Sequence, residues 1–330
     1  MSTPMHRAAA FHGLDTRSYQ RHALHATDLS WVEKNCYVDV WIELIHALDL
    51  DPMAMLAFTV AVDFEGDQWT FFKPPHEDLR LLYGLDVQEL YVWRPLIHHA
   101  LEHLAAGKFI STEADAFWLP DTAGTDYRQQ HTKTTIVLAE IDVAGQRLGY
   151  FHNAGYFSLE GEDFVRLFRI DVPSDPAFMS MYAELVRYDR AARVSTELLR
   201  AASLQLLRKH LDWRPADNPI ERFRLRFECD LPAIATQGMA QYHAWVFGTL
   251  RQLGAASELS ALYLGWLDPA QTGGYGAAAA ACTEISTICK SLIMKVARAV
   301  NAKRTLHCAA SFDAMGLAWD RATAGLRSVQ

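Results

Sequence analysis

The feature that most constrains the fold of this chain is a change in hydrophobic pattern near the segment Asp171-Val-Pro-Ser-Asp-Pro176. Before this segment, stretches with helical periodicity alternate with short apolar runs that are typical of strands. After it, apolar residues recur at helical spacing almost to the end of the chain. The sequence therefore predicts an α+β domain over residues 1–170, followed by an all-α helical bundle over residues 171–330.

Individual elements follow from the same patterns. Asn35 is a good N-cap for a helix that should end near Leu48, because Asp51-Pro52 follows. The other helices predicted in the first part are 75–83, 94–106 and 158–168, and the predicted strands are 56–64, 68–72, 108–112, 132–141 and 147–151. The helices predicted in the second part are 177–213, 220–253, 258–267, 277–303 and 312–327.

Composition excludes several classes of protein. Of the 330 residues, 50% are hydrophobic and 21% are charged, so the chain can bury a large core and is globular rather than disordered. No apolar run approaches the ~20 residues that span a bilayer, and the N-terminus lacks a signal-peptide pattern, so we expect a cytoplasmic protein without membrane segments. The five cysteines are scattered and form no Cys-x-x-Cys pair, which argues against disulfides and structural zinc.

The charges are unevenly distributed along the chain. The formal net charge of −8 argues against a general nucleic-acid-binding protein. Residues 1–170 contain 13 Lys and Arg against 24 Asp and Glu, whereas residues 171–330 contain 18 against 15. This difference is either ordinary variation between two surfaces or a sign of two partners of opposite charge.

Cys36 stands at the predicted start of the first helix, directly after the N-cap Asn35. Most free cysteines are small, buried, apolar residues, and this is one interpretation. The other is a nucleophile, because the positive end of a helix favours the thiolate that attacks an acyl group. Such a nucleophile also needs a base and a group that orients the base.

His131 and Asn153 could complete such a site. His131 directly precedes the predicted strand 132–141, and Asn153 follows the next strand, 147–151. A short turn between these strands makes them antiparallel neighbours, which brings the start of one close to the end of the other. The order Cys, His, Asn is the one that papain-like folds use. His152 is an alternative base, and His131 is alternatively a residue that only caps its strand.

Three other segments have simpler interpretations than a ligand site. The acidic turn Asp63-Phe-Glu-Gly-Asp67 is typical of a solvated loop, although it could bind a divalent cation. His99 and His103 lie one helical turn apart, but no third metal ligand is evident. Gly273-Gly-Tyr-Gly276 lacks the Lys-Ser/Thr of a phosphate-binding loop. We therefore expect no bound metal.

Five phrases of the sequence resemble a known family. They are Asn35-Cys-Tyr-Val-Asp39, Asp63-Phe-Glu-Gly-Asp-Gln-Trp-Thr-Phe-Phe-Lys73, Leu119-Pro-Asp-Thr122, His131-Thr-Lys-Thr-Thr135 and Gly149-Tyr-Phe-His-Asn-Ala-Gly155. On these phrases the chain is identified, over essentially its whole length, as a member of the bacterial domain-of-unknown-function family 1839. Members are often encoded near genes for nonribosomal peptides or carrier-protein ligases. At greater distance the layout is similar to butirosin biosynthesis protein H, in which a papain-like domain precedes a helical part.

The distant similarity implies a papain-like fold for residues 1–170 and a function in acyl transfer. Carried over by position, Cys36 would accept the acyl group, His131 would be its base and Asn153 would orient His131. Papain-like enzymes usually place a Gln several residues before the Cys, and Ser30 occupies that region here. Asp39 either lines the pocket or is an exposed polar residue. The residues expected at the oxyanion and substrate pocket are Asn35, Asp39, Trp69, Asp121 and His152.

The implied activity is that of an acyl- or aminoacyltransferase in a biosynthetic gene cluster for secondary metabolism. The acyl group would arrive on the phosphopantetheine arm of an acidic acyl or peptidyl carrier protein, without any other cofactor. It would leave on a small-molecule amine or alcohol, which the acidic first half could attract if it is cationic. Two alternatives stay open: a cysteine hydrolase or thioesterase, and a catalytically silent scaffold that binds the carrier protein. The candidates for carrier docking are Arg187, Arg190, Arg193, Lys295 and Arg298.

Overall fold

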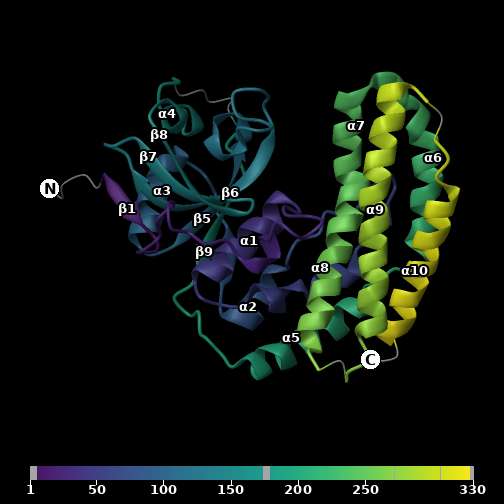
Figure 1. Cartoon of the computed structure of the whole chain (residues 1–330). Coiled ribbons are helices and arrows are strands. Elements are labelled where there is room, and N and C mark those ends of the chain that lie inside the picture. Colours follow the sequence, from purple (N-terminus) through teal and green to yellow (C-terminus); the bar gives the residue numbers. More distant parts are fainter. Residues whose placement is uncertain (1–5, 174–178, 271, 305, 328–330) are drawn as a thin grey trace. The chain divides into compact units, whose positions relative to one another are not determined.

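The computed structural model describes residues 6–173, 179–270, 272–304 and 306–327. The chain forms two compact units, each assembled from separate parts of the sequence (Figure 1). The first unit combines helices with an antiparallel sheet, and the second is almost entirely helical, so the predicted α+β class with a helical second part is confirmed. Unit 1 consists of Met1–Ala26, Asn35–Pro52 and His76–Arg193, and unit 2 of Thr27–Lys34, Met53–Pro75 and Val194–Gln330.

Unit 1 is built on a seven-stranded antiparallel sheet. Six of its strands lie in the order β4–β9–β5–β6–β7–β8, and β1 pairs with β6. β1 and β5 pair with different parts of β6, at residues 140–142 and 133–138. The strands are β1 (Arg7–Ala9), β4 (Asp86–Glu89), β5 (Phe109–Asp115), β6 (Lys133–Asp142), β7 (Arg147–His152), β8 (Gly155–Glu160) and β9 (Ala183–Arg187).

The helices of unit 1 pack against this sheet. α1 contacts β6, β7 and β8, and α3 contacts β1, β5 and β6. Val38, Trp41 and Ile45 of α1 are fully buried, because apolar residues at three- and four-residue spacing fall on one side of a helix. β6 is buried on both sides from Ile136 to Ala139, as expected of a covered central strand. The helices are α1 (Cys36–Ala47), α2 (His76–Tyr83), α3 (Leu96–Ala105) and α4 (Glu162–Leu167), with 3₁₀ turns at Ala23–His25, Ala116–Trp118 and Pro120–Thr122.

Several segments differ from the elements predicted from the sequence. Pro52–Ala61 forms a 3₁₀ helix that includes residues 56–61, where a strand was predicted, because a continuous apolar run does not distinguish a buried strand from a buried helix. The predicted helix 158–168 begins only at Glu162, since residues before it belong to β8. Residues 183–187 form β9 rather than part of a helix, and pair with the distant strands β4 and β5. The predicted boundary segment lies partly outside the described residues, at positions 174–176, as does residue 177.

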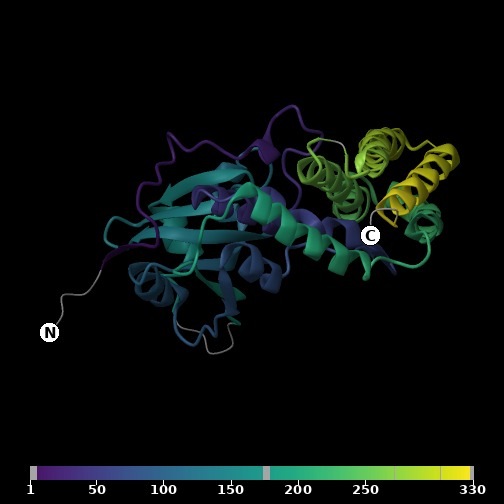
Figure 2. The ribbon, with the colours of Figure 1, turned by 90° about the horizontal axis from the view of Figure 1, so that it is seen from below.

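Unit 2 combines a helical bundle with a small hairpin, β2 (Phe64–Glu65) and β3 (Gln68–Trp69). α9 packs on α8 and α10, and α6 contacts α7, α9 and α10. Figures 1 and 2 show α8, α9 and α10 running alongside one another, at length in the first view and foreshortened in the second. The helices are α5 (Thr196–Leu211), α6 (Pro219–Gln237), α7 (Met239–Val246), α8 (Gln252–Leu267), α9 (Gly276–Ala302) and α10 (Ala309–Arg327), with a π-helical turn at Phe247–Arg251.

The short segment Thr27–Lys34 belongs to the helical unit although it precedes α1. The indole nitrogen of Trp31 donates to Oγ of Ser286 on α9 at 2.8 Å. Glu258 on α8 accepts the backbone N–H groups of Ser30 and Trp31 at 2.9 and 3.1 Å. A Cβ atom on Gly254 would lie 2.4 Å from the Trp31 ring, so only glycine leaves room for the indole there. Trp31 is therefore a core residue of the bundle.

Of the described helices, α9 alone is long and apolar enough to cross a membrane by length and composition. The core helix of a bundle meets the same criteria. Cys289 and Leu292 of α9 are fully buried, in a helix that packs on α8 and α10. Of the apolar stretch in α9, 39% is buried inside the structure.

Candidate functional site

Cys36 is the first residue of α1 and is partly exposed. The predicted N-cap is confirmed, since the side-chain oxygen of Asn35 accepts the N–H groups of Tyr37 and Val38. The N–H of Asp39 reaches the carbonyl oxygen of Asn35 at 3.0 Å. Within the described part of the chain, the N–H of Cys36 itself has no acceptor. It is the one donor of the first helical turn that is left for a ligand.

The thiol of Cys36 has a threonine as its neighbour. Its Sγ lies 3.8 Å from Oγ1 of Thr135, the third residue of β6. His131 stands four residues earlier, which corresponds to about 13 Å along an extended strand. No hydrogen bond joins Cys36 to His131 among the residues that the structure describes. The structure therefore brings Cys36 to the strand that His131 precedes, but not to the imidazole.

His131 has a carboxylate partner that the sequence did not reveal. Its Nδ1 lies 2.6 Å from Oδ2 of Asp115, the last residue of β5. The imidazole is 69% exposed and stacks on Phe117, with ring centroids 4.4 Å apart. Asp115 is paired in register with Lys133, so the end of β5 lies beside the start of β6. Within the described chain, the hydrogen-bond partner of the His131 imidazole is therefore Asp115 and not Asn153.

Asn153 lies in the tight turn between β7 and β8. His152 and Gly155 form the last pair of this hairpin, and Asn153 is the first residue of the turn. Its φ is +43°, in the left-handed region that Asn adopts more readily than most residues. Turn geometry therefore accounts for an Asn at this position, and no described hydrogen bond links its side chain to His131.

His152, the alternative base, is buried between a carboxylate and a hydroxyl group. Its Nδ1 lies 2.6 Å from Oδ2 of Asp121, and its Nε2 lies 2.8 Å from Oγ1 of Thr134. Tyr150 donates to the other oxygen of Asp121 at 2.5 Å. Thr134 and Thr135 point to opposite faces of β6, so His152 and Cys36 lie on opposite faces of the sheet. At 1% exposure, His152 holds β6, β7 and Asp121 together rather than facing a substrate pocket.

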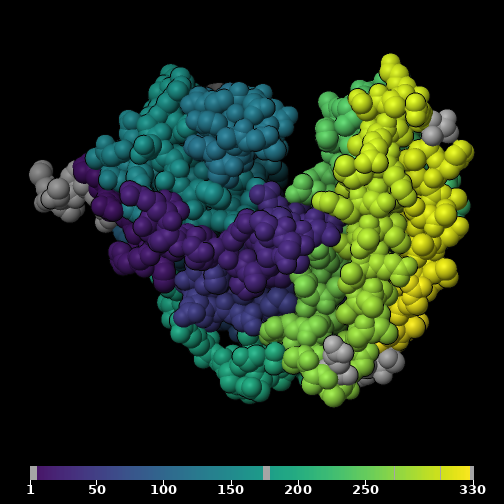
Figure 3. All heavy atoms as spheres, in the orientation of Figure 1, coloured from purple at the N-terminus to yellow at the C-terminus, as the bar shows by residue number. Residues whose placement is uncertain are grey.

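Asp39 is fully buried, so it is neither a pocket-lining nor an exposed residue. Its Oδ1 lies 3.0 Å from Nε2 of His25, and Nδ1 of the same ring contacts the carboxylate of Glu43. Burial alone would raise the pKa of Glu43, but hydrogen bonds from His25, Tyr19 and the backbone of His22 lower it. These contacts hold residues 19–25 against α1. Figure 3 shows the N-terminal segment, in purple, at the surface of unit 1.

A second polar cluster lies at the start of α1 and was not predicted. The Tyr37 hydroxyl lies 3.0 Å from both carboxylate oxygens of Glu184 on β9 and 2.8 Å from Nε2 of His76. Burial would raise the pKa of Glu184, but hydrogen bonds from His76, Tyr37 and Ser111 lower it. The His76 side chain is 35% exposed. Sequence patterns missed the cluster because Glu184 falls in a segment with apparent helical spacing.

Trp69, which we predicted in the substrate pocket, belongs to the core of unit 2. It is 1% exposed. Its ring packs against Phe64, Phe223 and Trp319. An indole that is enclosed by aromatic rings stabilises the helical unit and does not line a pocket.

The five residues predicted to dock a carrier protein are divided between the two units. Lys295 and Arg298 lie on α9 of unit 2, are exposed, and form no ion pair within the described residues. Arg187, Arg190 and Arg193 lie in unit 1, outside the helical unit for which we predicted them. The backbone of Arg190 packs against Gly84. The two ion pairs among them are Arg187–Asp86 and Arg193–Asp49.

The structure gives no support for the two segments that were considered for metal binding. The described residues contain no group of three or more His, Cys, Asp or Glu that could hold a metal ion. His99 and His103 stack in parallel, 6.1 Å apart, and burial lowers the pKa of both. Asp63 accepts a hydrogen bond from Arg222 at 2.6 Å.

Comparison with known sequences gives two matches, both to one family. The DUF1839 N-terminal domain matches residues 20–188, and the DUF1839 C-terminal domain matches residues 196–328. The two matches cover most of the chain, and the second begins at the first residue of α5. No curated protein matches the sequence.

Proposed function

The chain belongs to the DUF1839 family, and we propose that unit 1 is an acyl- or aminoacyltransferase with Cys36 as its nucleophile. The observation that carries this proposal is a partly exposed thiol on the first residue of α1, next to a backbone N–H that has no acceptor in the described chain. An N–H in that place can donate to the oxyanion that forms when a thioester is attacked. By contrast, burial raises the pKa of Cys282, Cys289 and Cys308.

The arrangement of unit 1 is compatible with a papain-like domain, which we include in the proposal. The nucleophile opens a helix that packs on an antiparallel sheet, and His131 precedes a strand of that sheet. His131 would act as the base, with Asp115 rather than Asn153 as its orienting residue. These are the roles of the residues in a Cys–His–acid triad, in which the acid fixes the tautomer of the imidazole.

The reaction would proceed through an enzyme-bound thioester. Sγ of Cys36 bonds to the carbonyl carbon of the donor, and the C–S bond to the phosphopantetheine arm of the carrier protein breaks. His131 takes the thiol proton and returns it to the leaving sulfur. An amine or alcohol then attacks the acyl group, gives up a proton through the same base, and releases Cys36.

Because His131 does not contact Cys36 in this structure, catalysis requires the segment before β6 to move. Residues 123–132 contain no helix or strand, so this change would break no regular element. The ring would have to leave Phe117 and approach Thr135. Substrate binding can supply the free energy for such a step.

We also propose that the donor is an acidic carrier protein and that the protein acts in the cytoplasm. The exposed Lys295 and Arg298 of α9, which have no acidic partner in the described chain, support a docking role. Arg187 and Arg193 are weaker candidates, because each is already paired with an aspartate.

Intact-mass spectrometry tests the nucleophile directly. After incubation with acetyl- and aminoacyl-pantetheine thioesters, we expect one acyl adduct on the wild type and on Cys229→Ala, and none on Cys36→Ala. Cys36→Ala should change the free energy of unfolding by about 1 kcal/mol or less, because a methyl group replaces a partly exposed thiol. An acyl adduct on Cys36→Ala in the same yield as on the wild type would disprove the proposal. Release of the acyl group to water rather than to an amine would identify a hydrolase instead.

A binding module without catalysis is the second candidate, and the Thr135 contact of Cys36 favours it. A thiol that bonds to a hydroxyl group and has no base beside it is not activated. In that case the rate of Cys36 alkylation by iodoacetamide would be the same in the wild type and in His131→Ala at every pH. A transferase would instead show a faster wild-type reaction near neutral pH, provided that the movement of His131 occurs without substrate.

A further inference from the structure

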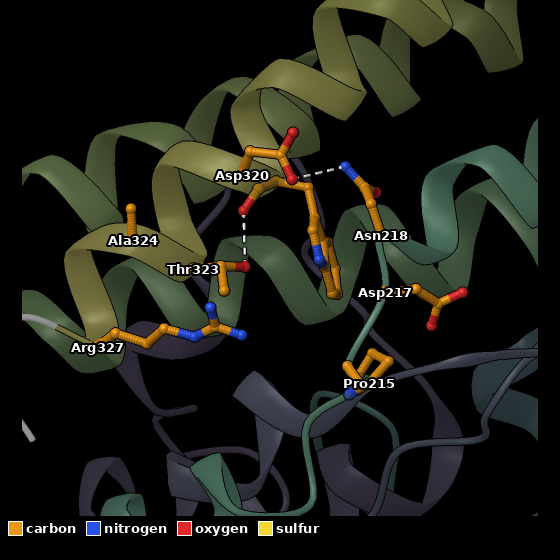
Figure 4. A pocket seen from close by; sticks show the side chains of 9 residues that line it. Pro215, Asp217, Asn218, Asp320, Thr323, Ala324 and Arg327 are labelled. Carbon is orange, nitrogen blue, oxygen red and sulfur yellow. Dashed lines mark hydrogen bonds between the residues drawn. The ribbon is translucent and has the colours of Figure 1, made fainter.

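Unit 2 contains a cavity of about 260 Å³ between the C-terminal end of α10 and the segment that leads into α6 (Figure 4). The charged groups that line it are the guanidinium of Arg327 and the carboxylates of Asp217 and Asp320. Asp320 accepts a hydrogen bond from Asn218 at 3.0 Å and keeps its charge. Such a mixture of charges favours no single class of ligand. The polar cluster at the start of α1, in unit 1, is more specific.

In this cluster a buried carboxylate holds His76, the first residue of α2. Glu184 is 1% exposed, and its Oε1 lies 3.3 Å from Nε2 of His76. The Tyr37 hydroxyl lies 2.8 Å from the same ring nitrogen and 3.0 Å from both oxygens of Glu184. Tyr182 donates a further hydrogen bond to Oε1 of Glu184 at 3.1 Å. The Nε2 edge of the imidazole is therefore fixed by two neighbouring groups.

These contacts determine which ring nitrogen of His76 is available to a ligand. Burial raises the pKa of Tyr37, so the phenol keeps its hydrogen and donates it to Glu184. The carboxylate beside Nε2 favours the tautomer with the hydrogen on Nε2, so that Nδ1 of the neutral ring carries a lone pair. Nδ1 has no partner within the described residues, and the side chain is 35% exposed. It can accept a hydrogen bond from an N–H or O–H group of a ligand.

His76 and Cys36 contact side chains on the same face of the sheet. Glu184 of β9 and Val137 of β6 are both paired with the same residue of β5, so they project from one face. Thr135 stands two residues from Val137 on β6 and shares that face. Cys36 contacts Thr135, and His76 contacts Glu184. Two strands across and two residues along correspond to about 12 Å between the Cα atoms of Glu184 and Thr135.

We propose that His76 binds one end of the acceptor in the acyl transfer, by accepting a hydrogen bond at Nδ1. This role rests on the function proposed for Cys36. Because the two residues contact different parts of one sheet face, the acceptor has two donor groups. One is the amine that attacks the thioester on Cys36, and the other is an N–H or O–H group that His76 holds. The substrate class is then an amino alcohol or a diamine rather than a simple amine.

Discharge of the acylated enzyme measures acceptor binding separately from acylation. The full chain is acylated with an aminoacyl-pantetheine thioester and mixed with ethanolamine, aminobutanol or aminohexanol, or with the methyl ether of each. The ethers keep the amine but lack the hydroxyl donor. We expect at least one amino alcohol to discharge the wild type with saturation. Its ether should need an about 3- to 10-fold higher concentration for half-saturation, the usual effect of one hydrogen bond.

Variants of His76 separate ligand binding from a structural role. Glutamine places an amide N–H near the position of Nε2, so it can keep the contact with Glu184, but it has no counterpart of Nδ1. His76→Gln should therefore lose the preference for the alcohol over its ether while Cys36 is acylated as before. Asparagine places its amide oxygen near Nδ1, so His76→Asn should keep most of the preference. His98→Gln, at an exposed position of α3, is the matched control.

The outcomes distinguish this role from the proposed function of Cys36. An acylated wild type that the alcohols and their ethers discharge equally well would disprove the role of His76 alone. The role is also disproved if His76→Gln keeps the preference shown by His98→Gln, because His76 is then only a structural partner of Glu184. A wild type that forms no acyl adduct on Cys36 would contradict the proposed function and this role together. Should His76→Gln not fold, His76→Ala, which removes the whole ring, takes its place.

Discussion

At the scale of single residues, His22 links the stability of the N-terminal segment to pH. Burial and the neighbouring His46 lower the pKa of His22 to about 4. Its Nδ1 accepts the N–H of Leu24 at 3.1 Å, which requires an unprotonated nitrogen. The unfolded chain takes up this proton near pH 6.5, whereas the folded chain does so only near pH 4. Between these values the unfolded state binds more protons, so stability falls as the pH falls.

We therefore expect His22→Asn to reduce the pH dependence of stability between pH 7 and pH 5. Asparagine can still accept the N–H of Leu24 but does not titrate. Urea unfolding at several pH values measures the slope, with the exposed His12→Asn as the control. The pKa of Glu43 is also lowered, but its effect on stability falls below the ordinary value of 4.5 and so outside the range from pH 7 to pH 5. An unchanged slope in His22→Asn would mean that another group causes the pH dependence.

At the scale of elements, the start of α1 joins stability to the candidate site. Asn35 satisfies two N–H groups of the first turn and so fixes the direction in which Cys36 projects. Asn35→Ala should lower the free energy of unfolding by about 1 kcal/mol, the usual effect of losing an N-cap, whereas Asn35→Asp should retain most of it. Urea denaturation compares the two variants. Equal stability of Asn35→Ala and wild type would show that the cap contributes nothing here.

The elements that the sequence predicts well are those with local signals. α1, α2 and α3 follow from apolar spacing and capping residues, and β6 and β7 follow from two apolar runs joined by a short turn. β9 could not be predicted, because its five residues gain their partners from β4 and β5, about 70 or more residues earlier in the chain. Helical spacing in Met181, Tyr182 and Leu185 was coincidental in that segment.

In the candidate site, too, the features with local signals were predicted and those that depend on distant parts of the chain were not. The helix start at Cys36 is a local property, and it was predicted together with its N-cap. Which side chain meets the thiol depends on the register between α1 and β6, and the structure places Thr135 there instead of His131. The partner of His131 depends on the pairing of β5 with β6, which brings in Asp115. A buried residue such as Asp39 gives no sign in the sequence of the histidine that contacts it.

At the scale of the whole molecule, the sequence order of the chain does not coincide with its compact units. The matched C-terminal domain begins at residue 196, yet unit 2 also takes Thr27–Lys34 and Met53–Pro75 from the region matched by the N-terminal domain. These two segments contribute Trp31 and Trp69, which are 5% and 1% exposed. The helical unit is therefore completed by residues that precede it by more than a hundred positions.

A fragment limited to residues 194–330 should consequently fail to form a stable bundle. It would lack both indoles, and loss of one buried Trp side chain removes about 3–5 kcal/mol. The combined loss is comparable with the whole stability of a typical domain, about 5–15 kcal/mol. Circular dichroism with urea titration measures this, and we expect weak, non-cooperative unfolding of the fragment.

Variants of the full chain provide the matched comparison for that fragment. Trp31→Ala removes the ring that fills the space above Gly254 and leaves the Oγ of Ser286 without its indole donor. Trp69→Ala removes the ring that packs on Phe223 and Trp319. Each should destabilise unit 2 by about 3 kcal/mol or more while the sheet of unit 1 keeps its own core. If residues 194–330 alone unfold cooperatively at the urea midpoint of unit 2 in the intact chain, Thr27–Lys34 and Met53–Pro75 do not contribute to the stability of the bundle, and the prediction is wrong.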